Sequence, residues 1–357
     1  MRKFDYKQFV TSKWDSEIVT GIGKIHEYKG RQDFYLQRNP QELTRLIEIA
    51  KIQSTESSNK IEGILTTSAR FHQLLAEKTT PKNRDESEIL GYRDVLNTIH
   101  ENYAYIPVRP SFILQLHRDL FKYSFSSTGG KFKNVQNYIT ARTADGNEYV
   151  LFTPVSPTET PHAVESICLN YNQFAGTGKL DDLILASIFI CDFLCVHPFL
   201  DGNGRMSRLL TTLLLYRSGY QIGKYISLEK LIEQTKNSYY DALLQISQDW
   251  HNGSNDYRPF IKYLLKIILR AYRELDERID LVKEKLPAYE MVKRVVEKML
   301  GSFSKKEILE KCPSIGSSSV EMALKKLKDE QVIKTIGAGR NTRYVRHHQI
   351  FNILFQI

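Results

Sequence analysis

The stretch His197–Arg208 (HPFLDGNGRMSR) constrains this chain more than any other part of it. It follows an apolar run, Ile184–Val196, that predicts a buried helix because aliphatic and aromatic residues fill almost every position. His197-Pro198 ends that helix, since proline disfavours the α conformation in the residue before it. A second helix is expected from about Arg205. The sequence therefore predicts a helix–loop–helix whose glycine-rich loop lies at a helix N-terminus, which is a natural anion site.

The loop carries residue types that suit a nucleotide. Gly202, Asn203 and Gly204 can form a nest of backbone N–H donors for a phosphate group. Arg205 and Arg208 lie about one helical turn apart, so both can face the same charged ligand.

Two further side chains supply chemistry. Asp201, just before the nest, is a hard oxygen ligand suited to Mg²⁺. His197 is a base that titrates near neutrality. Taken singly, a His-Pro pair is an ordinary helix cap and an arginine pair is a solvated face. Together these residues predict a nucleotide site with a general base beside it.

The order of residues in this stretch resembles the signature of the Fic (Fido) family, H-P-F-x-[D/E]-G-N-G-R-x-x-R, at every defined position. The resemblance implies a mainly α fold, a helical bundle with a β-hairpin flap. It also implies transfer of AMP from ATP and Mg²⁺ to a Tyr, Thr or Ser hydroxyl of a target protein. The implied catalytic base is His197 and the implied metal ligand is Asp201. The implied nucleotide contacts are Gly202, Asn203, Gly204, Arg205 and Arg208.

A helix is expected over about residues 40–63, with Pro40 in its first turn and Gly63 at its end. On the residues alone, Ser58 and Glu62 simply share one face of a helix end. They also resemble, with Gly63, the [S/T]-x-x-x-E-[G/N] inhibitory motif of the Fic class that carries its inhibitor N-terminally. That resemblance implies that Glu62 pairs with Arg208 and competes with the γ-phosphate of ATP for it.

Residues 129–161, which precede the apolar run, are the least helical part of the chain. Asp145-Gly146 and Gly146-Asn147 are turn dipeptides between strand-forming stretches, which predicts a β-hairpin. In the Fic family a hairpin here docks the target segment, and an exposed strand edge suits that role. An ordinary surface hairpin is the alternative. The implied docking residues are Val150, Leu151, Phe152 and Thr153.

Two more stretches resemble family features. Tyr239 and Tyr240 resemble a tyrosine pair that helps to line the adenine pocket, although tyrosines in helices commonly serve only packing. Gly130–Lys133 (GKFK) matches the family's G-x-[YF]-R except that Lys133 replaces arginine.

The C-terminal part, residues 286–357, predicts a small winged helix-turn-helix domain of three short helices and two strands. Ser304 is the expected N-cap of its second helix, and one of three serines caps the third (Ser317, Ser318 or Ser319). Residues 285–357 contain 14 Lys+Arg and 7 Asp+Glu, so +7 of the chain's net +9 lies there. This concentration makes DNA a candidate partner, with protein docking as the alternative. The candidate DNA contacts are Lys325, Lys326, Lys328, Arg340 and Arg343.

The whole chain is expected to comprise an N-terminal helical region (1–105), the Fic core and following helices (106–285) and the C-terminal domain (286–357). No apolar stretch is long enough to span a bilayer, and the N-terminus lacks the apolar run of a signal peptide. A cytoplasmic protein without a membrane partner is therefore expected. Its cysteines should be reduced core thiols, since their spacing does not suit a metal (Cys168, Cys191, Cys195 and Cys312).

Three alternatives to AMP transfer stay open. A Fic enzyme can transfer a different group, or it can remove AMP from a modified protein with Glu62 orienting a water. A third alternative is a regulator that senses a nucleotide and binds DNA. Besides the target protein, the sequence leaves self-modification and a homodimer open.

Overall fold

The computed structural model describes residues 2–36, 40–124, 128–142, 145–283, 286–299, 301–312, 315–337, 339 and 342–347. The contacts within the chain define two compact units. Unit 1 comprises residues 1–32 and 50–272, and unit 2 comprises residues 33–49 and 273–357.

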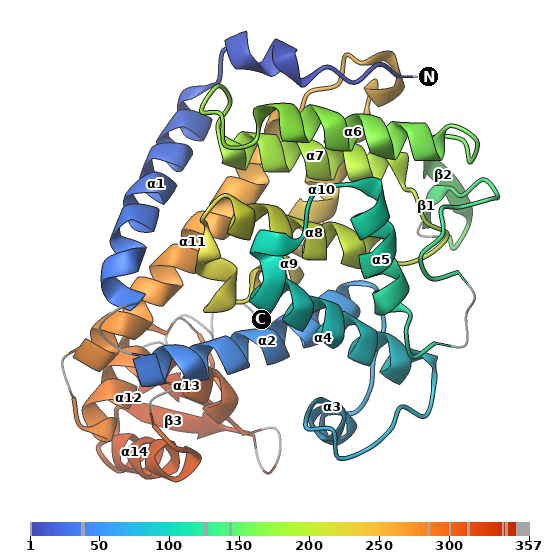
Figure 1. The fold of residues 1–357 in the computed structure, drawn as a ribbon. Coiled ribbons are helices and arrows are strands. Elements are labelled where there is room, and N and C mark those ends of the chain that lie inside the picture. The colour runs from blue at the N-terminus through green and yellow to red at the C-terminus, as the bar shows by residue number, and fades with distance from the viewer. Residues whose placement is uncertain are drawn as a thin grey trace. The chain divides into compact units, whose positions relative to one another are not determined.

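The chain is mainly helical, as predicted (Figure 1). Up to residue 120 the elements are η1 (Tyr6–Thr11), α1 (Ser16–Leu36), α2 (Pro40–Ile61), α3 (Ser68–Leu75), α4 (Arg84–Asn102), η2 (Tyr103–Tyr105) and α5 (Pro110–Leu120). Then come β1 (Ile139–Arg142), β2 (Glu148–Phe152), α6 (Thr160–Phe174), α7 (Asp182–Val196), α8 (Asn203–Arg217) and η3 (Gln221–Lys224). The remaining elements before residue 284 are α9 (Leu228–Gln234), α10 (Lys236–Ser247), η4 (Trp250–Asn252) and α11 (Arg258–Lys283).

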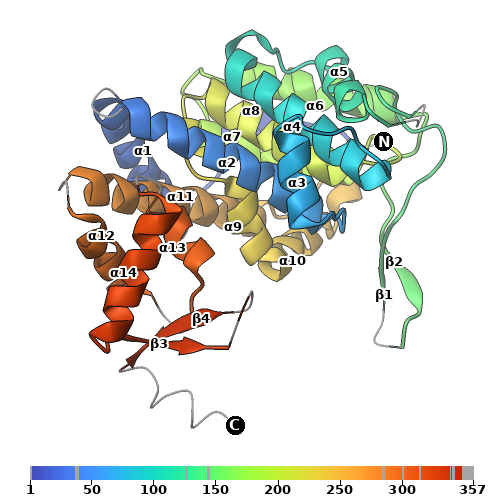
Figure 2. The same ribbon diagram turned by 90° about the horizontal axis from the view of Figure 1, so that it is seen from below.

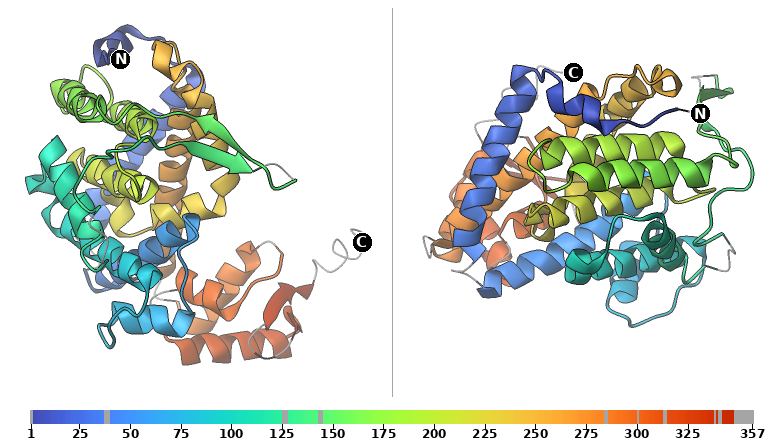
Figure 3. Two further views of the ribbon diagram at one scale, coloured as in Figure 1. Left: turned by 90° about the vertical axis from the view of Figure 1, so that its right-hand side faces the viewer. Right: turned by 45° about the horizontal axis from the view of Figure 1, so that its top comes forward.

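Helix α7 is the centre of unit 1. Every residue from Leu183 to Val196 is buried, because a helix that is apolar all round can satisfy its side chains only inside a core. It packs against α6 on one side and α8 on the other, and these three helices run alongside one another (Figures 1 and 3). The residues that follow α7 are thereby attached to the buried centre of the unit.

The predicted β-hairpin is confirmed. Strands β1 and β2 pair antiparallel, with a register irregularity between Ile139 and Thr140. The hairpin extends away from the helices (Figures 2 and 3). Only Phe152 of β2 is buried, and its ring stacks on His251 at 5.1 Å and meets Trp250 edge-on at 6.0 Å. The base of the hairpin is therefore anchored while its outer residues stay exposed.

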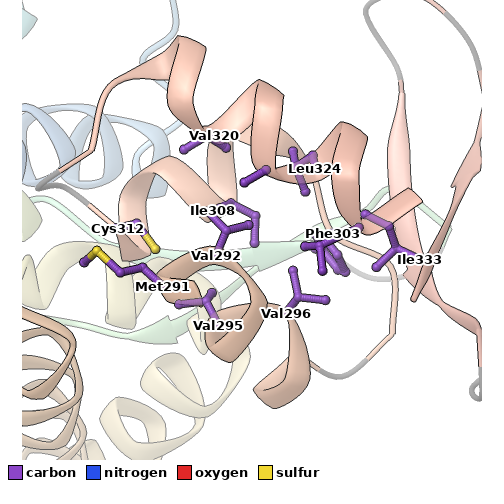
Figure 4. Packing of buried hydrophobic residues seen from close by; sticks show 12 residues of the cluster. Met291, Val292, Val295, Val296, Phe303, Ile308, Cys312, Val320, Leu324 and Ile333 are labelled. Carbon is purple, nitrogen blue, oxygen red and sulfur yellow. The ribbon is translucent and has the colours of Figure 1, made fainter. Parts of the chain in front are cut away.

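Unit 2 contains α12 (Ala288–Lys298), α13 (Lys305–Lys311), α14 (Ser317–Asp329) and the antiparallel strands β3 (Ile333–Ile336) and β4 (Arg343–Arg346). Its core draws on all three helices, on Phe303 and on Ile333 of β3 (Figure 4). Phe303 also pairs with Tyr344 of β4 through two backbone hydrogen bonds. The three helices and the hairpin are as expected, and the assignment to the winged-helix class stays a prediction.

Of the two helix caps expected in unit 2, one is confirmed and one is wrong. Ser304 caps α13 in a complete capping box with Glu307. The expected serine cap of α14 is wrong, because Gly316 occupies the N-cap and Ser317 already lies in the first turn. Helices α1 and α3 were not predicted. Candidate DNA contact Arg340 lies outside the described residues.

Within the described part of the chain, no helix combines the length and the apolar character that crossing a membrane requires.

Candidate active site

His197 lies at the C-terminal end of α7 in the left-handed conformation, with φ 49°. Its backbone N–H donates to the Phe193 carbonyl at 2.9 Å, which closes the last turn of the helix. Its Nδ1 lies 3.1 Å from the Leu194 carbonyl, an acceptor only, so Nδ1 carries the proton. This tautomer leaves Nε2 as the basic nitrogen, which is the form a general base needs.

The electrostatic surroundings keep His197 neutral. Burial, with a contribution from Lys133, lowers its pKa to about 4, although the Leu194 hydrogen bond, Glu62 and Asp201 oppose the shift. The imidazole is consequently unprotonated at neutral pH, the state in which Nε2 is available as a proton acceptor.

The loop after His197 is held by side chains from the segment before β1. Asn137 Nδ2 donates to the carbonyls of His197 at 3.1 Å and Phe199 at 2.9 Å. Lys133 Nζ donates to the Val196 carbonyl at 3.1 Å and to Asn137 Oδ1 at 2.8 Å. Sequence reasoning noted Lys133 only as a departure from the family pattern, and Asn137 carried no sequence signal at all.

A buried histidine supports the same loop from α5. The His117 ring stacks on Phe199 with centroids 3.6 Å apart. The Gly130 N–H donates to His117 Nδ1 at 3.0 Å, so His117 Nε2–H is left to donate to the Asp201 carbonyl at 3.1 Å. Burial lowers the pKa of His117 to about 4, which keeps it in this neutral state.

The glycines of the loop are required for two different reasons. Gly202 has φ 79°, and a Cβ there would lie 3.0 Å from the Phe121 ring. Helix α8 begins at Asn203, two residues before the expected Arg205, because the Asn203 side chain bonds both backbone groups of Phe199 and starts the turn early. A Cβ on Gly204 would lie only 2.1 Å from Glu62 Oε1. The Glu62 carboxylate therefore lies directly against the first turn of α8.

Arg208 connects α8 to the end of α2. Its Nε donates to Ser58 Oγ at 2.8 Å, and its Nη2 donates to the Ser58 carbonyl at 2.9 Å and to Glu62 Oε1 at 2.8 Å. The Arg208 side chain is 3% exposed and that of Glu62 is 32% exposed. Among the described residues, Arg208 Nη1 makes no hydrogen bond.

The end of α2 places Glu62 at this position. Ile64 N–H bonds the Asn59 carbonyl and Gly63 N–H bonds the Lys60 carbonyl, which is a Schellman motif with Gly63 at φ 78°. Glu62 is thus the C-cap residue, where the helix dipole disfavours a carboxylate. Arg208 and the N-terminus of α8 supply the compensating positive charge.

Polar contacts hold the same helix to α9. The Ser54 hydroxyl donates to Glu229 Oε2 at 2.6 Å, and Glu229 Oε1 also accepts from the Tyr92 hydroxyl of α4 at 3.1 Å. Ser57 Oγ donates to Glu233 Oε2 at 2.5 Å. The serine-rich stretch that reads as a weak helix is therefore a buried, hydrogen-bonded face.

Asp201 lies within a cluster of charges. Its carboxylate accepts from Arg84, and Arg205 Nη2 lies 3.6 Å from Asp201 Oδ1. Arg205 Nη1 in turn pairs with Glu88 Oε2 at 2.7 Å. Arg84 and Glu88 were missed, because a charged i, i+4 pair at a helix start is typical of a solvated face.

These groups surround one cavity of about 620 Å³. Tyr239 is buried and Tyr240 is 42% exposed, with ring centroids 5.4 Å apart. Val150 and Thr153 of the predicted docking set and Ser58 of the inhibitory set are not part of the lining. The predicted residues that line the cavity are His197, Asp201, Gly202, Asn203, Gly204, Arg205, Arg208, Glu62, Gly63, Tyr239, Tyr240, Leu151 and Phe152.

The donor set of this cavity fits Mg²⁺ bound together with a nucleotide. Mg²⁺ commonly takes one or two carboxylates and completes its shell with phosphate oxygens and waters. The Asp201 side chain is 42% exposed at the cavity wall, beside the N-terminal turn of α8. In the part of the chain that is described, His, Cys, Asp and Glu side chains form no cluster of three that would bind a metal unaided.

The neutral histidines predict a stability that depends on pH. Burial lowers the pKa of His100 to about 3 and those of His117 and His197 to about 4, below the value of about 6.5 in an unfolded chain. Between pH 6.5 and 4 the unfolded state binds more protons, so the free energy of unfolding falls as the pH is lowered. The loss is about 1.4 kcal/mol per pH unit for each group inside its window.

Urea unfolding at pH 7 and pH 5 measures this effect, and the midpoint should be lower at pH 5. His100→Gln removes one titrating group and should flatten the dependence. A midpoint that stays constant or rises at pH 5 would contradict the burial of neutral histidines.

Comparisons with known proteins found matches to this part of the chain. Residues 107–215 match the sequence model of the Fic/DOC family. The chain is 26% identical over 253 residues to "Protein adenylyltransferase Fic" of Drosophila grimshawi, covering 67% of this chain and 47% of that protein. It is 30% identical over 154 residues to "Protein adenylyltransferase fic-1" of Caenorhabditis elegans, covering 43% of this chain and 26% of the relative. The chain thus spans less than half the length of these curated relatives.

Solved structures give the same fold. A Fic domain containing signaling protein from Bacteroides thetaiotaomicron superposes with a TM-score of 0.58 at 26% identity, covering 72% of this chain and 95% of that one. A Fic family protein from Desulfovibrio desulfuricans superposes with a TM-score of 0.59 over 94% of this chain and 97% of the other. At 17% identity, the latter likeness concerns the fold alone.

Proposed function

We propose that this chain, a Fic/DOC family protein whose family domain covers residues 107–215, transfers AMP from ATP to a hydroxyl side chain of a target protein. It is a distant homologue of proteins named protein adenylyltransferases. The observation that carries the proposal is the meeting of three groups in one cavity. These are a neutral His197, the N-terminal turn of α8 and the buried guanidinium of Arg208.

Each group has a role in such a transfer. The first turn of α8 offers backbone N–H groups and a positive dipole end to the phosphates. Arg208 supplies charge-assisted donors, including the Nη1 group that makes no hydrogen bond within the described chain. Tyr239 and Tyr240 at the cavity wall offer aromatic surface for the adenine ring. Asp201 would hold Mg²⁺, which neutralises phosphate charge when bound.

The reaction then needs one proton acceptor and one leaving group. His197 Nε2 takes the proton of the target hydroxyl as its oxygen attacks the α-phosphorus. The bond between the α-phosphorus and the bridging oxygen breaks, and pyrophosphate leaves. Hairpin residues Val150 and Leu151 are exposed and offer a strand edge on which an extended target segment is aligned. Rate enhancement comes mainly from position and electrostatics.

Autoinhibition by Glu62 is part of the proposal. The Glu62 carboxylate lies against Gly204 and bonds Arg208, so it fills the position that a terminal phosphate would take. ATP binding in a reactive arrangement therefore requires Glu62 to leave. The hydroxyl and the carbonyl of Ser58 accept hydrogen bonds from the Arg208 guanidinium and orient it toward Glu62.

The nature of the transferred group tests the function. The Glu62→Gly variant is incubated with Mg²⁺, a target extract and ATP labelled either at the α- or at the γ-phosphate. AMP transfer places only the α-label on protein. Protein labelled from the γ-position would instead show phosphate transfer and overturn the proposal.

DNA binding by unit 2 is a second candidate function, favoured by two exposed lysines on α14, Lys325 and Lys328. In a winged helix the third helix enters the major groove. Binding of the full chain to a labelled duplex should then weaken steeply as salt is raised, and Lys325→Ala/Lys328→Ala should weaken it further. Absence of binding at low salt would leave unit 2 as a protein-docking module.

A further inference from the structure

Both oxygens of the Asp201 carboxylate are already engaged. The Gly202 N–H donates to Oδ1 at 2.5 Å, and Arg205 Nη2 lies 3.6 Å from the same oxygen. Arg84 Nη2 donates to Oδ2. A divalent cation that binds this carboxylate therefore competes with the two arginines for its negative charge and its oxygen lone pairs.

The two arginines differ in how firmly they are held. The Arg205 side chain is 1% exposed, pairs with Glu88 at 2.7 Å and lies over the Phe121 ring at 5.3 Å. Arg84 is the first residue of α4, and its side chain is 68% exposed. Its second partner is Glu88, through Nε. Arg84 is thus the more weakly held of the two arginines, because its side chain is exposed and its bond to Glu88 uses Nε and not the Nη2 group that contacts Asp201.

We propose that the Arg84 guanidinium pairs with the Asp201 carboxylate in the absence of metal. When a nucleotide binds together with a divalent cation, Arg84 moves away and the cation binds Asp201 in its place. Arg84 lines the same cavity as Arg208 and the first turn of α8. Once Mg²⁺ binds Asp201, the Arg84 guanidinium would be free to bind phosphate oxygens of the nucleotide in the same cavity. Arginine commonly binds phosphate through two parallel N–H donors. Metal binding and nucleotide binding therefore assist each other through Arg84. This inference rests on the proposed nucleotide site.

Removal of Arg84 should leave the fold intact. Arg84→Ala removes the hydrogen bond from Arg84 Nε to Glu88 Oε1, but Glu88, which is 1% exposed, keeps its ion pair with Arg205 and is not left as an unpaired buried charge. Arg84→Lys retains one positive charge but not the two-pronged donor. Arg31→Ala is a matched control, because Arg31 is another exposed arginine in an i, i+4 ion pair, with Glu27 of α1.

The experiment measures Mn²⁺ binding by electron paramagnetic resonance in full-length Glu62→Ala protein, with and without saturating ADP. Without nucleotide, Arg84→Ala should bind Mn²⁺ roughly two- to fivefold more tightly, since an exposed competing ion pair is worth that much. With ADP bound, this advantage should disappear or reverse. The Mn²⁺ affinity with ADP divided by the affinity without ADP measures the coupling between metal and nucleotide binding. This ratio should be smaller in Arg84→Ala than in its parent. The Mn²⁺ affinities of Arg84→Lys should lie between those of the parent and those of Arg84→Ala. The affinities of Arg31→Ala should equal those of the parent.

Two failures are distinguishable. If ADP binds normally and Arg84→Ala has the same two Mn²⁺ affinities as its parent, the role of Arg84 is overturned while the nucleotide site stands. If ADP does not bind the parent protein at all, the proposed function fails and this inference fails with it.

Discussion

Replacement of Glu62 by glycine is expected to raise AMP transfer by roughly 10- to 100-fold, the equivalent of one charge-assisted hydrogen bond. In the resting protein the Glu62 carboxylate holds Arg208 at 2.8 Å and lies against Gly204. Under the proposed autoinhibition, ATP binds productively only in the fraction of molecules in which this contact is open, which lowers its apparent affinity. The variant removes this competition. Labelling by α-labelled ATP and nucleotide titration by calorimetry measure the two effects.

The same substitution should lower the stability of the nucleotide-free protein. Arg208 is 3% exposed and would lose the counter-charge that Glu62 provides. A decrease of about 1–3 kcal/mol in the free energy of unfolding is expected, and saturating ATP should recover much of it. An enzyme that is more active yet less stable without ligand distinguishes an inhibitory contact from a purely structural one.

Two further substitutions separate charge from backbone effects. Glu62→Ala lacks the flexibility of glycine and should be activated to a similar extent. Glu62→Gln keeps the shape but not the charge and should be activated less. Unchanged transfer rates in both the glycine and the alanine variants would contradict autoinhibition. If the glycine and alanine variants instead lose the ability to remove AMP from a modified protein, the alternative in which Glu62 orients a water for AMP removal is favoured.

Replacement of His197 by alanine is expected to reduce transfer by roughly 100- to 10,000-fold, the usual contribution of a positioned general base. The Nδ1 contact with the Leu194 carbonyl orients the ring and leaves Nε2 to take the proton. Nucleotide binding should change little, because Arg208 and the first turn of α8 remain. The measurement is labelling and ADP affinity in the Glu62→Gly background, in which the expected activity of the parent is higher.

His72→Ala is the matched control, since His72 is an exposed histidine on α3. It should leave both quantities unchanged. Persistent labelling in the His197→Ala variant would remove His197 from the role of base. A parallel loss of nucleotide affinity would instead mean that His197 acts through the loop rather than on the proton.

The parts of the site that lie close together in sequence were predictable. His197, Asp201 and the Gly202–Gly204 turn form a local motif, so their place together at the wall of one cavity could be expected from the sequence. The Glu62–Arg208 contact spans 146 residues and was foreseen only through resemblance to the Fic inhibitory motif. The hairpin was predictable because turn dipeptides and strand formers act locally.

What could not be predicted depends on long-range contacts. Arg84 is 117 residues from Asp201, and Asn137 is 60 residues from His197. Neither side chain differs in type from an ordinary surface residue. The early start of α8 depends on the Asn203 side chain bonding back to Phe199, which single-residue helix preferences do not express. Helix α1 was missed because its three glycines and mixed polarity obscure the helical period.

The central claim is that His197 catalyses AMP transfer under the control of Glu62. The most direct test is mass spectrometry of a cell lysate incubated with ATP and Mg²⁺ and either the Glu62→Gly protein or the Glu62→Gly/His197→Ala protein. The account predicts AMP on Tyr, Thr or Ser side chains of one or a few proteins in the first sample only. AMP-modified peptides at equal abundance in both samples, or a different transferred group in the first, would contradict it.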